Sequence, residues 1–204
     1  MKKIIILICL ILFPVFMGAH ENWVTYWQKG NRIAIAICNG HEFPASSLLL
    51  KERIINYAYI ITPLGKRIKV KTKAAGNKRI VSYSAPVKGT YIVITALKNP
   101  PRYFMKTLFT VGTATHNLIA GEDLELITRR NPHNLKKGER AIITLNYKGK
   151  AVSGDLSVLT PGGKRISSFT NSKGQFVLPL RRGGIYLVSG FYRGKGCTLV
   201  FRIK

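Results

Sequence analysis

The stretch TPLGKRI at residues 62–68 returns as TPGGKRI at residues 160–166. A second pair of segments follows, KGTYIV at 88–93 and RGGIYLV at 182–188. In each copy a Pro/Gly turn precedes a basic strand, and a glycine then leads into a strand whose tyrosine can bury its ring. The sequence therefore predicts a duplicated β unit. Chance similarity between turn-rich β segments is the alternative interpretation.

The rest of the chain has the same texture. Short apolar or alternating runs recur between Gly, Pro and Asn residues, while helical periodicity is scarce beyond the first residues. Frequent strands without helix-length crossovers favour antiparallel sandwiches. We therefore expect an all-β protein of two tandem antiparallel β-sandwich domains, of immunoglobulin-like or transthyretin-like type. The strands are expected at 32–38, 54–61, 91–97, 104–111, 124–128, 141–146, 156–160, 176–180, 185–189 and 198–203.

The domain limits follow from the ends of these patterns. Apolar alternation lapses between Gly112 and Asp123, so we expect domains at 20–117 and 124–204. Before them, Lys2 and Lys3 precede an apolar run that ends in Gly18 and Ala19. This pattern is typical of a signal peptide at residues 1–19, cleaved after Ala19. It predicts a periplasmic or secreted protein.

Composition excludes several classes of protein. Hydrophobic residues make up 46% of the 204-residue chain, and its 19 Gly and 9 Pro lack a three-residue period, so disordered and collagen-like chains are excluded. The formal net charge of +25 indicates an anionic partner. We expect that partner to be an anionic envelope polymer or a lipid surface. Nucleic acid is not expected, because no reading helix or aromatic RNA-binding motif is present. A general basic bias that only maintains solubility is the alternative.

The predicted basic surface is a single hairpin. On a strand, alternate side chains share a face and lie about 6.6 to 7 Å apart, so alternating cations form a row. The expected row consists of Lys66, Arg67, Lys69, Lys71, Lys73, Lys78 and Arg79.

Two cysteines, Cys38 and Cys197, remain after removal of the leader. An oxidising compartment permits a disulfide between them. Two buried, unpaired thiols acting as small apolar groups fit the same positions. Pairing requires Cα atoms within about 7 Å, so both interpretations stay open.

Short motifs in a fixed order carry a resemblance to a known family. They are HENW at 20–23, GHEFP at 40–44, and LEL at 124–126 followed by Asn131-Pro132, Leu135 and Gly138. Together they resemble the exported domain-of-unknown-function family formerly catalogued as the NikM-type periplasmic component of ABC-type cobalt/nickel transport. The second half also resembles the transthyretin-like or carboxypeptidase-regulatory β-sandwich. The resemblance implies an exported protein that binds a transition metal, with a metal-uptake ABC transporter as partner.

Three histidines are the candidate metal ligands. After cleavage, His20 would carry a free amine and an imidazole, and His41 a second imidazole in a glycine turn at a strand end. His116 would supply a further nitrogen. These ligands suit a nickel, cobalt or copper ion, and no organic cofactor is expected. The alternatives are a loop-holding hydrogen bond for His41, a frayed terminus for His20 and a solvated loop for His116.

Enzyme motifs are missing from the sequence. It contains no Gly-x-Ser-x-Gly, His-Glu-x-x-His, Walker or dinucleotide-binding pattern. Glu122, Asp123 and Glu125 cluster near the domain boundary, where we expect them to pair with neighbouring Lys and Arg. The sequence predicts a non-enzyme whose leading function is periplasmic binding of nickel or cobalt in metal uptake. The alternative is an envelope-associated structural or adhesive protein that binds anionic polymers through a basic face.

Overall fold

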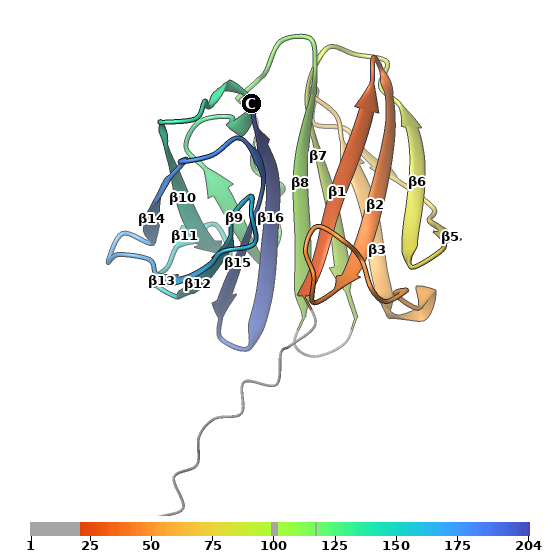
Figure 1. Ribbon diagram of the computed structural model, residues 1–204. Helices are drawn as coiled ribbons and strands as arrows, with labels where there is room; N and C mark the ends of the chain where they lie inside the picture. Colours follow the sequence, from red (N-terminus) through yellow and green to blue (C-terminus); the bar gives the residue numbers. More distant parts are fainter. Residues whose placement is uncertain (1–20, 99–101, 117) are drawn as a thin grey trace, which may run out of the picture.

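The protein is built from strands. The computed structural model describes residues 21–98, 102–116 and 118–204, and this part of the chain forms sixteen strands and two short 3₁₀ helices, η1 (Glu52–Ile54) and η2 (Pro132–Asn134). Every strand expected from the sequence overlaps an observed one. The all-β sandwich class is therefore confirmed (Figure 1). Across the same three ranges, no helix has the length and hydrophobicity needed to cross a bilayer.

The first eight strands form one sandwich. One of its sheets has the order β1-β2-β6-β5, and the other consists of β8-β7-β3-β4. This is the A-B-E-D and G-F-C arrangement of immunoglobulin-like domains, with one additional edge strand, β4. The strands are β1 (Glu21–Lys29), β2 (Arg32–Gly40), β3 (Ile55–Ile61), β4 (Arg67–Lys69), β5 (Lys73–Ala75), β6 (Lys78–Ser84), β7 (Gly89–Leu97) and β8 (Tyr103–Val111).

The last eight strands repeat this order. Strand β10 lies between β9 and β14 in one sheet, and β16-β15-β12-β13 form the other layer. The strands are β9 (Leu124–Thr128), β10 (Arg140–Tyr147), β11 (Lys150–Ala151), β12 (Asp155–Leu159), β13 (Arg165–Phe169), β14 (Gln175–Pro179), β15 (Gly184–Tyr192) and β16 (Lys195–Ile203). The second unit has no strand that corresponds to β5, because β13 and β14 are joined by a connection without a strand.

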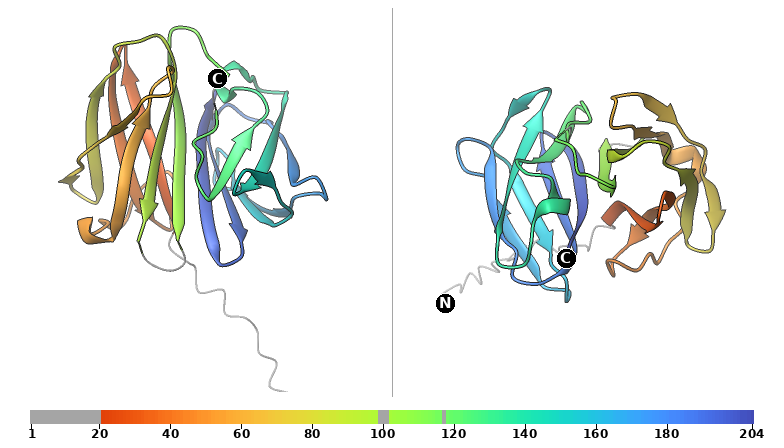
Figure 2. Two further views of the ribbon diagram at one scale, coloured as in Figure 1. Left: turned by 180° about the vertical axis from the view of Figure 1, so that it is seen from behind. Right: turned by 90° about the horizontal axis from the view of Figure 1, so that it is seen from above.

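The two units share one sheet. The last strands of the two units, β8 and β16, pair in parallel, which gives an eight-stranded sheet of order β13-β12-β15-β16-β8-β7-β3-β4. Read outward from its centre, this order gives equivalent strands on both sides. A half turn about a line along β8 and β16 therefore relates the units approximately, and it places their smaller sheets on opposite faces of the shared sheet (Figure 2).

The same half turn explains the packing between the units. Trp23 of β1 belongs to a buried cluster with Leu187 of β15 and Val200 of β16. Reciprocally, Ile94 of β7 belongs to a cluster with Leu126 of β9. Each unit thus lays its first strand against the outer face of the other unit's sheet. Burial of such large apolar side chains contributes on the order of 1.5 to 3 kcal/mol each.

The sequence repeat corresponds to a repeated set of contacts. Tyr91 donates its hydroxyl to the carbonyl of Val87 (2.7 Å), and Tyr186 donates to the carbonyl of Arg182 (2.8 Å). These are tyrosine corners at the start of equivalent strands. A Cβ added to Gly89 would lie 2.6 Å from Pro63 Cβ, and one added to Gly184 would lie 2.7 Å from Pro161 Cβ. The repeated Pro and Gly therefore form the same close contact in both units.

The domain boundary and the cysteines can now be compared with the sequence-based expectations. The boundary between β8 and β9 falls within the predicted loop, but Leu118 and Ala120 in that loop are buried in the core that covers β7 and β8. The limits 117 and 124 remain predictions, since the units share a sheet. Cys38 and Cys197 are both free and buried, in separate core clusters. The disulfide alternative is therefore not realised in this structure.

Candidate functional site

The structure does not bring His41 and His116 together. His41 directly follows Gly40, which pairs with Glu21 at the start of β1. His116 follows β8, whose Thr110 carbonyl accepts a hydrogen bond from Gln28 near the far end of β1 (3.0 Å). The seven residue steps from Glu21 to Gln28 (28 − 21) span about 23 Å of strand. The two histidines thus lie at opposite ends of the first sandwich and cannot bind the same ion.

The remaining predicted ligand, His20, lies outside the described residues. Within residues 21–98, 102–116 and 118–204, no group of three or more His, Cys, Asp or Glu side chains is close enough together to hold a metal ion. His133 lies in η2, where burial and the positive charge of Lys204 lower its pKa. Burial and Lys204 therefore account for the lowered pKa of His133.

The acidic cluster is divided among different partners. Lys195 Nζ lies 2.5 Å from an Asp123 carboxylate oxygen, and Lys106 Nζ lies 2.9 Å from Glu125 Oε2. Glu122 accepts a hydrogen bond from the hydroxyl of Tyr57. The expectation that these carboxylates pair with neighbouring cations is confirmed for all three, since Arg67 Nη1 lies 3.9 Å from Glu122 Oε1. Because each carboxylate is engaged separately, the cluster is not arranged as a general acid and base.

The prediction of a single basic hairpin is wrong, because β4 pairs with β3 in one sheet and β5 pairs with β6 in the other. The cations of this segment lie instead along one open side of the first sandwich. Strand β4 is the edge of the eight-stranded sheet and β5 is the edge of the four-stranded sheet, so both edges are lined by basic side chains. Lys78 Nζ lies 5.1 Å from the ring centroid of Trp27, a favourable cation–π contact. Because β1 and β5 are opposite edges of the four-stranded sheet, this contact directs Lys78 away from β5. We call the surface along β4 and β5 the basic edge; it consists of Lys66, Arg67, Lys69, Lys71 and Lys73.

Arg79 is not part of the basic edge, contrary to the prediction. Its side chain is 7% exposed, and its guanidinium bonds Glu52 Oε2 (2.8 Å) and Thr72 Oγ1 (2.7 Å). The reason is strand alternation, because Arg79 lies on the same side of β6 as the core residue Val81. Arg79 therefore ties β6 to the segment between β4 and β5.

The protein has far too few acids to neutralise its cations. The described residues include all 8 acids and 31 of the 33 Lys and Arg, since only Lys2 and Lys3 fall outside them. At least 23 cations (31 − 8) therefore have no acid of their own. Six of the acids form ion pairs, and three of these pairs include a largely buried cation or acid: Arg79–Glu52, Lys106–Glu125 and Arg67–Glu122. The basic edge consequently carries a strong positive potential.

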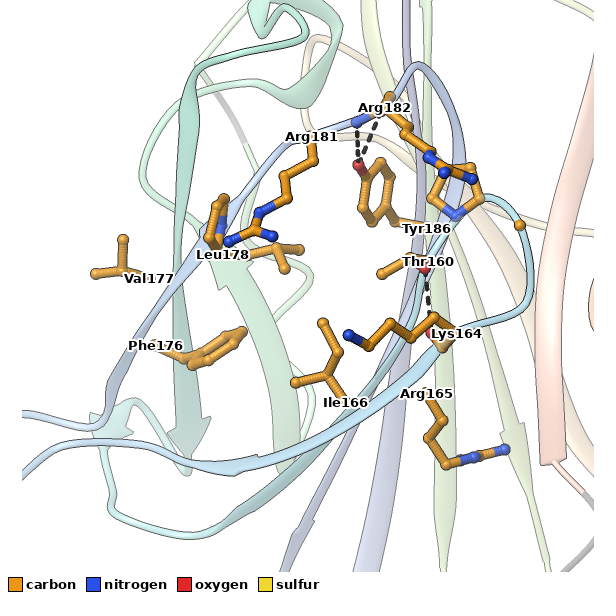
Figure 3. Close-up of a pocket in the computed structure, with 13 residues that line it drawn as sticks. Thr160, Lys164, Arg165, Ile166, Phe176, Val177, Leu178, Arg181, Arg182 and Tyr186 are labelled. Carbon is orange, nitrogen blue, oxygen red and sulfur yellow. Dashed lines mark hydrogen bonds between the residues drawn. The ribbon is translucent and has the colours of Figure 1, made fainter.

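A pocket of about 560 Å³ opens between the edge strands of the second sandwich (Figure 3). Its apolar walls come from Ile166 of β13 and from Phe176 and Leu178 of β14. Figure 3 shows the side chains of Lys164 and Arg181 directed into the space between these walls. No Asp or Glu is among its lining residues. The pocket therefore combines an apolar interior with positive charge.

The tyrosine corner holds one wall of this pocket in place. The hydroxyl of Tyr186 accepts from the backbone N–H of Arg182 (3.3 Å) and donates to its carbonyl, so the segment that carries Arg181 is fixed to β15. Arg165 points away from the pocket and pairs with Glu21 (2.6 Å). The sequence analysis missed this site. A usable signal was the shorter stretch after the basic strand in the second copy of the repeat: five residues separate β13 from β14, whereas eight residues, including β5, separate β4 from the equivalent strand β6.

Comparison with known proteins gives no relative in sequence: no family model matches the chain, and no curated protein does. Among solved structures, the chain is similar to a tetra-tandem repeat from the extending region of a large adhesion protein, at 11% identity and a TM-score of 0.31, over 91% of this chain and 50% of that one. It is also similar to the fibronectin(III)-like modules of Clostridium thermocellum CbhA, at 11% identity and a TM-score of 0.27, over 89% and 94% of the two chains.

A third similar structure is the N-terminal four-immunoglobulin-domain segment of Dscam1, at 16% identity and a TM-score of 0.26, over 90% and 45% of the two chains. This chain thus spans half or less of the adhesion repeat and of the Dscam1 segment. The fold assignment rests on the strand order of the chain itself. That order defines the class: a tandem immunoglobulin-like β-sandwich protein whose two units share a sheet.

Proposed function

We propose that this protein is an exported, non-enzymatic binding module that attaches to anionic polymers of the cell envelope through its basic edge. The observation that carries this proposal is the gathering of exposed cations on and between the edge strands β4 and β5 of a protein that has only 8 acids. A polymer with regularly spaced phosphates or carboxylates can meet several of these side chains at once. Many weak contacts then add to a useful affinity that depends on salt.

Edge lysines have a second role that must be separated from binding. Charged side chains on an edge strand prevent pairing with the edge strands of other molecules. That role explains cations on β4 and on β5 individually. It does not require the basic residues outside the two strands, Lys66 in the turn before β4 and Lys71 between β4 and β5. Polymer binding accounts for all of them together.

Salt-dependent retention on immobilised lipopolysaccharide tests this proposal. In the edge variant, Lys66, Lys69, Lys71 and Lys73 are changed to Gln. The matched control carries the same loss of charge on exposed positions of the second unit. The control changes are Lys136→Gln, Lys137→Gln, Lys150→Gln and Lys173→Gln.

We expect the edge variant to elute at clearly lower salt than both the natural protein and the control. Equal shifts for both variants would show that only net charge matters, and would contradict a dedicated surface. Retention that does not change between low and high salt would also count against the proposal, because contacts between exposed charges are screened beyond about 8 to 10 Å.

Metal binding is a second candidate, favoured by one specific observation. Glu21, the first described residue and the one that follows His20 in the sequence, pairs with Gly40, the residue that precedes His41. The ligands would be the amine and imidazole of His20 and the imidazole of His41. His116 no longer belongs to this set. The ions that suit nitrogen ligands of this kind are nickel, cobalt and copper.

Calorimetry with Cu²⁺ and Ni²⁺ tests this candidate on protein without an affinity tag and with His20 as its first residue. His41→Ala should abolish stoichiometric binding, while His133→Ala should leave it unchanged, because His133 lies in η2 of the second unit. Equal binding by the natural protein and His41→Ala would remove the metal site. A role in metal uptake with an ABC transporter depends on a positive result.

A further inference from the structure

The two units differ at one place in their otherwise equivalent order of strands. In the first unit β5 pairs with β6 and borders the open side of the sandwich. In the second unit β14 is equivalent to β6, but no strand corresponding to β5 pairs with it. The connection at residues 170–174 contains no strand. The pocket opens along this unfilled side. It is therefore a consequence of how the second unit departs from the duplicated pattern.

The walls of the pocket are apolar side chains at the border of the core. Leu178 points inward and is almost fully buried, while Ile166 and Phe176 are half-buried and face the opening. The volume of about 560 Å³ lies within the range of about 300 to 1,000 Å³ that is usual for small-molecule pockets. Apolar surface of this extent is stabilised when an apolar ligand displaces water from it.

The charges at the pocket are not matched by the protein. Lys164 and Arg181 point into it, and neither forms an ion pair with any acid in residues 21–98, 102–116 or 118–204. Arg182 lines the same pocket. These side chains are exposed to solvent, and the pocket lining holds no acid, so a bound anion would form charge-assisted hydrogen bonds that the protein itself does not supply. Charge complementarity thus favours an anionic occupant.

We propose that this pocket binds an amphiphilic anion, a molecule with an acyl chain and a carboxylate or phosphate head group. The chain would lie between Ile166, Phe176 and Leu178, and the head group would bind Lys164 and Arg181 through charge-assisted hydrogen bonds. An added peptide strand fits less well, because Pro179 has no backbone donor at the end of β14. The site is separate from the basic edge, and its occupancy does not depend on polymer binding.

Calorimetry with three soluble probes tests the proposal. Decyl phosphate carries both the chain and the charge, decanol carries the chain alone, and inorganic phosphate carries the charge alone. We expect decyl phosphate to bind with one-to-one stoichiometry, and the other two to bind at least about tenfold more weakly, since each lacks one set of contacts. Equal affinity for inorganic phosphate or for decanol would overturn the proposal.

Variants locate the binding. Lys164→Gln and Arg181→Gln should each weaken decyl phosphate binding about tenfold, a loss of about 1.4 kcal/mol. Lys173→Gln removes the same charge from an exposed turn outside the pocket lining and should have no effect. Unfolding curves establish that each variant is folded. Unchanged affinity in both pocket variants, or an equal loss in Lys173→Gln, would rule the pocket out.

Two further measurements complete the test. Ile166→Glu places an acid in the pocket wall at a half-buried position and should prevent binding of decyl phosphate without loss of the fold. Vesicles that contain phosphatidylglycerol distinguish the sources of the ligand. If Lys164→Gln loses binding to the vesicles, the ligand is a bilayer lipid. If it loses binding only to dissolved decyl phosphate, the ligand is a free amphiphile. Either result supports the site. The edge variant should bind decyl phosphate normally, so failure of either proposal can be recognised separately.

Discussion

Lys106 of β8 and Glu125 of β9 form an ion pair inside the protein, with 2% and 3% of their side chains exposed. Lys106 Nζ also donates to the carbonyls of Leu118 (2.6 Å) and Leu126 (3.0 Å). Glu125 accepts further hydrogen bonds from the backbone N–H groups of Ala120 and Gly121. Since β8 belongs to the first unit and β9 to the second, these bonds join the two units.

Removing one partner of this pair should destabilise the protein strongly. Lys106→Met leaves the Glu125 carboxylate buried without its cation, so we expect a loss of about 3 to 5 kcal/mol in the free energy of unfolding. The double variant Lys106→Met/Glu125→Gln should lose less than the sum of the two single variants. Urea unfolding measures all three. Arg130→Met removes an exposed partner of Glu139 and should have little effect; a loss as large as that of Lys106→Met would contradict this account.

The two tyrosine corners should contribute similar amounts to the free energy of unfolding. Tyr91→Phe and Tyr186→Phe each remove a hydroxyl that bonds both polar groups of one backbone residue, at a cost of about 1 to 3 kcal/mol. Tyr83→Phe is the matched control, because the buried Tyr83 hydroxyl has no hydrogen-bond partner among the described residues. Its removal should be neutral or stabilising. A large loss in only one of the two corner variants would argue against equivalent roles.

The cysteines should behave as free, protected thiols. Burial raises the pKa of Cys38 to about 11, against the opposing charge of Lys78, and burial also raises the pKa of Cys197. Thiolate is the reactive form, so both should react very slowly with a thiol reagent at pH 8 in the folded protein. Both should react at once in denaturant. A mass lower by two hydrogens in freshly purified protein would instead reveal a disulfide.

The contribution of Glu122 to the free energy of unfolding should change with pH in the opposite direction to that of an ordinary ion-paired acid. Its pKa is raised, chiefly by burial, while the hydrogen bond from Tyr57 and the charge of Arg67 oppose that shift. A carboxyl with a raised pKa stabilises the fold below its unfolded pKa near 4.5, and this contribution is lost as the pH rises through the folded pKa. The free energy of unfolding of Glu122→Gln should therefore increase relative to the natural protein as the pH rises from below 4.5 towards neutrality.

Glu139→Gln serves as the control for this experiment. Bonds from the backbone of Lys136 and from Arg130 lower the pKa of Glu139, so its contribution to stability is present above its unfolded pKa and is lost in acid. The difference between Glu139→Gln and the natural protein should thus change with pH in the opposite direction. The same pH slope in both variants would show that the pKa of Glu122 is not raised in the folded protein.

Local signals predicted most strands but not all of them. The strand of Glu21–Lys29 was not predicted, because its burial is uneven: Trp23 is fully buried between the units, whereas Trp27 on the same side of the strand is half exposed. Arg79 was placed on the surface because arginine is usually exposed. Its burial is decided by Glu52 and Thr72, which approach it from other segments.

For the candidate site too, the sequence predicted local features but not contacts between distant segments. The sequence identified the cations of the basic edge but placed them on one hairpin, whereas β4 ends at Lys69 and β4 and β5 belong to different sheets. It also grouped His41 with His116, which the structure separates by the length of β1. The pocket beside Lys164 and Arg181 was not predicted at all. Distances between residues far apart in the chain depend on which strands become neighbours, and side-chain periodicity carries no such information.

The sequence by itself determined the class of fold, the duplication and the large excess of positive charge, because alternation, turn residues and composition are local or additive properties. Tertiary structure decided that β8 and β16 pair in parallel, that the units share one sheet and a buried ion pair, and that the second unit is left open at a pocket. These features arise from contacts between segments up to about the length of a whole unit apart. Such contacts are fixed only when the apolar faces of both units pack against each other.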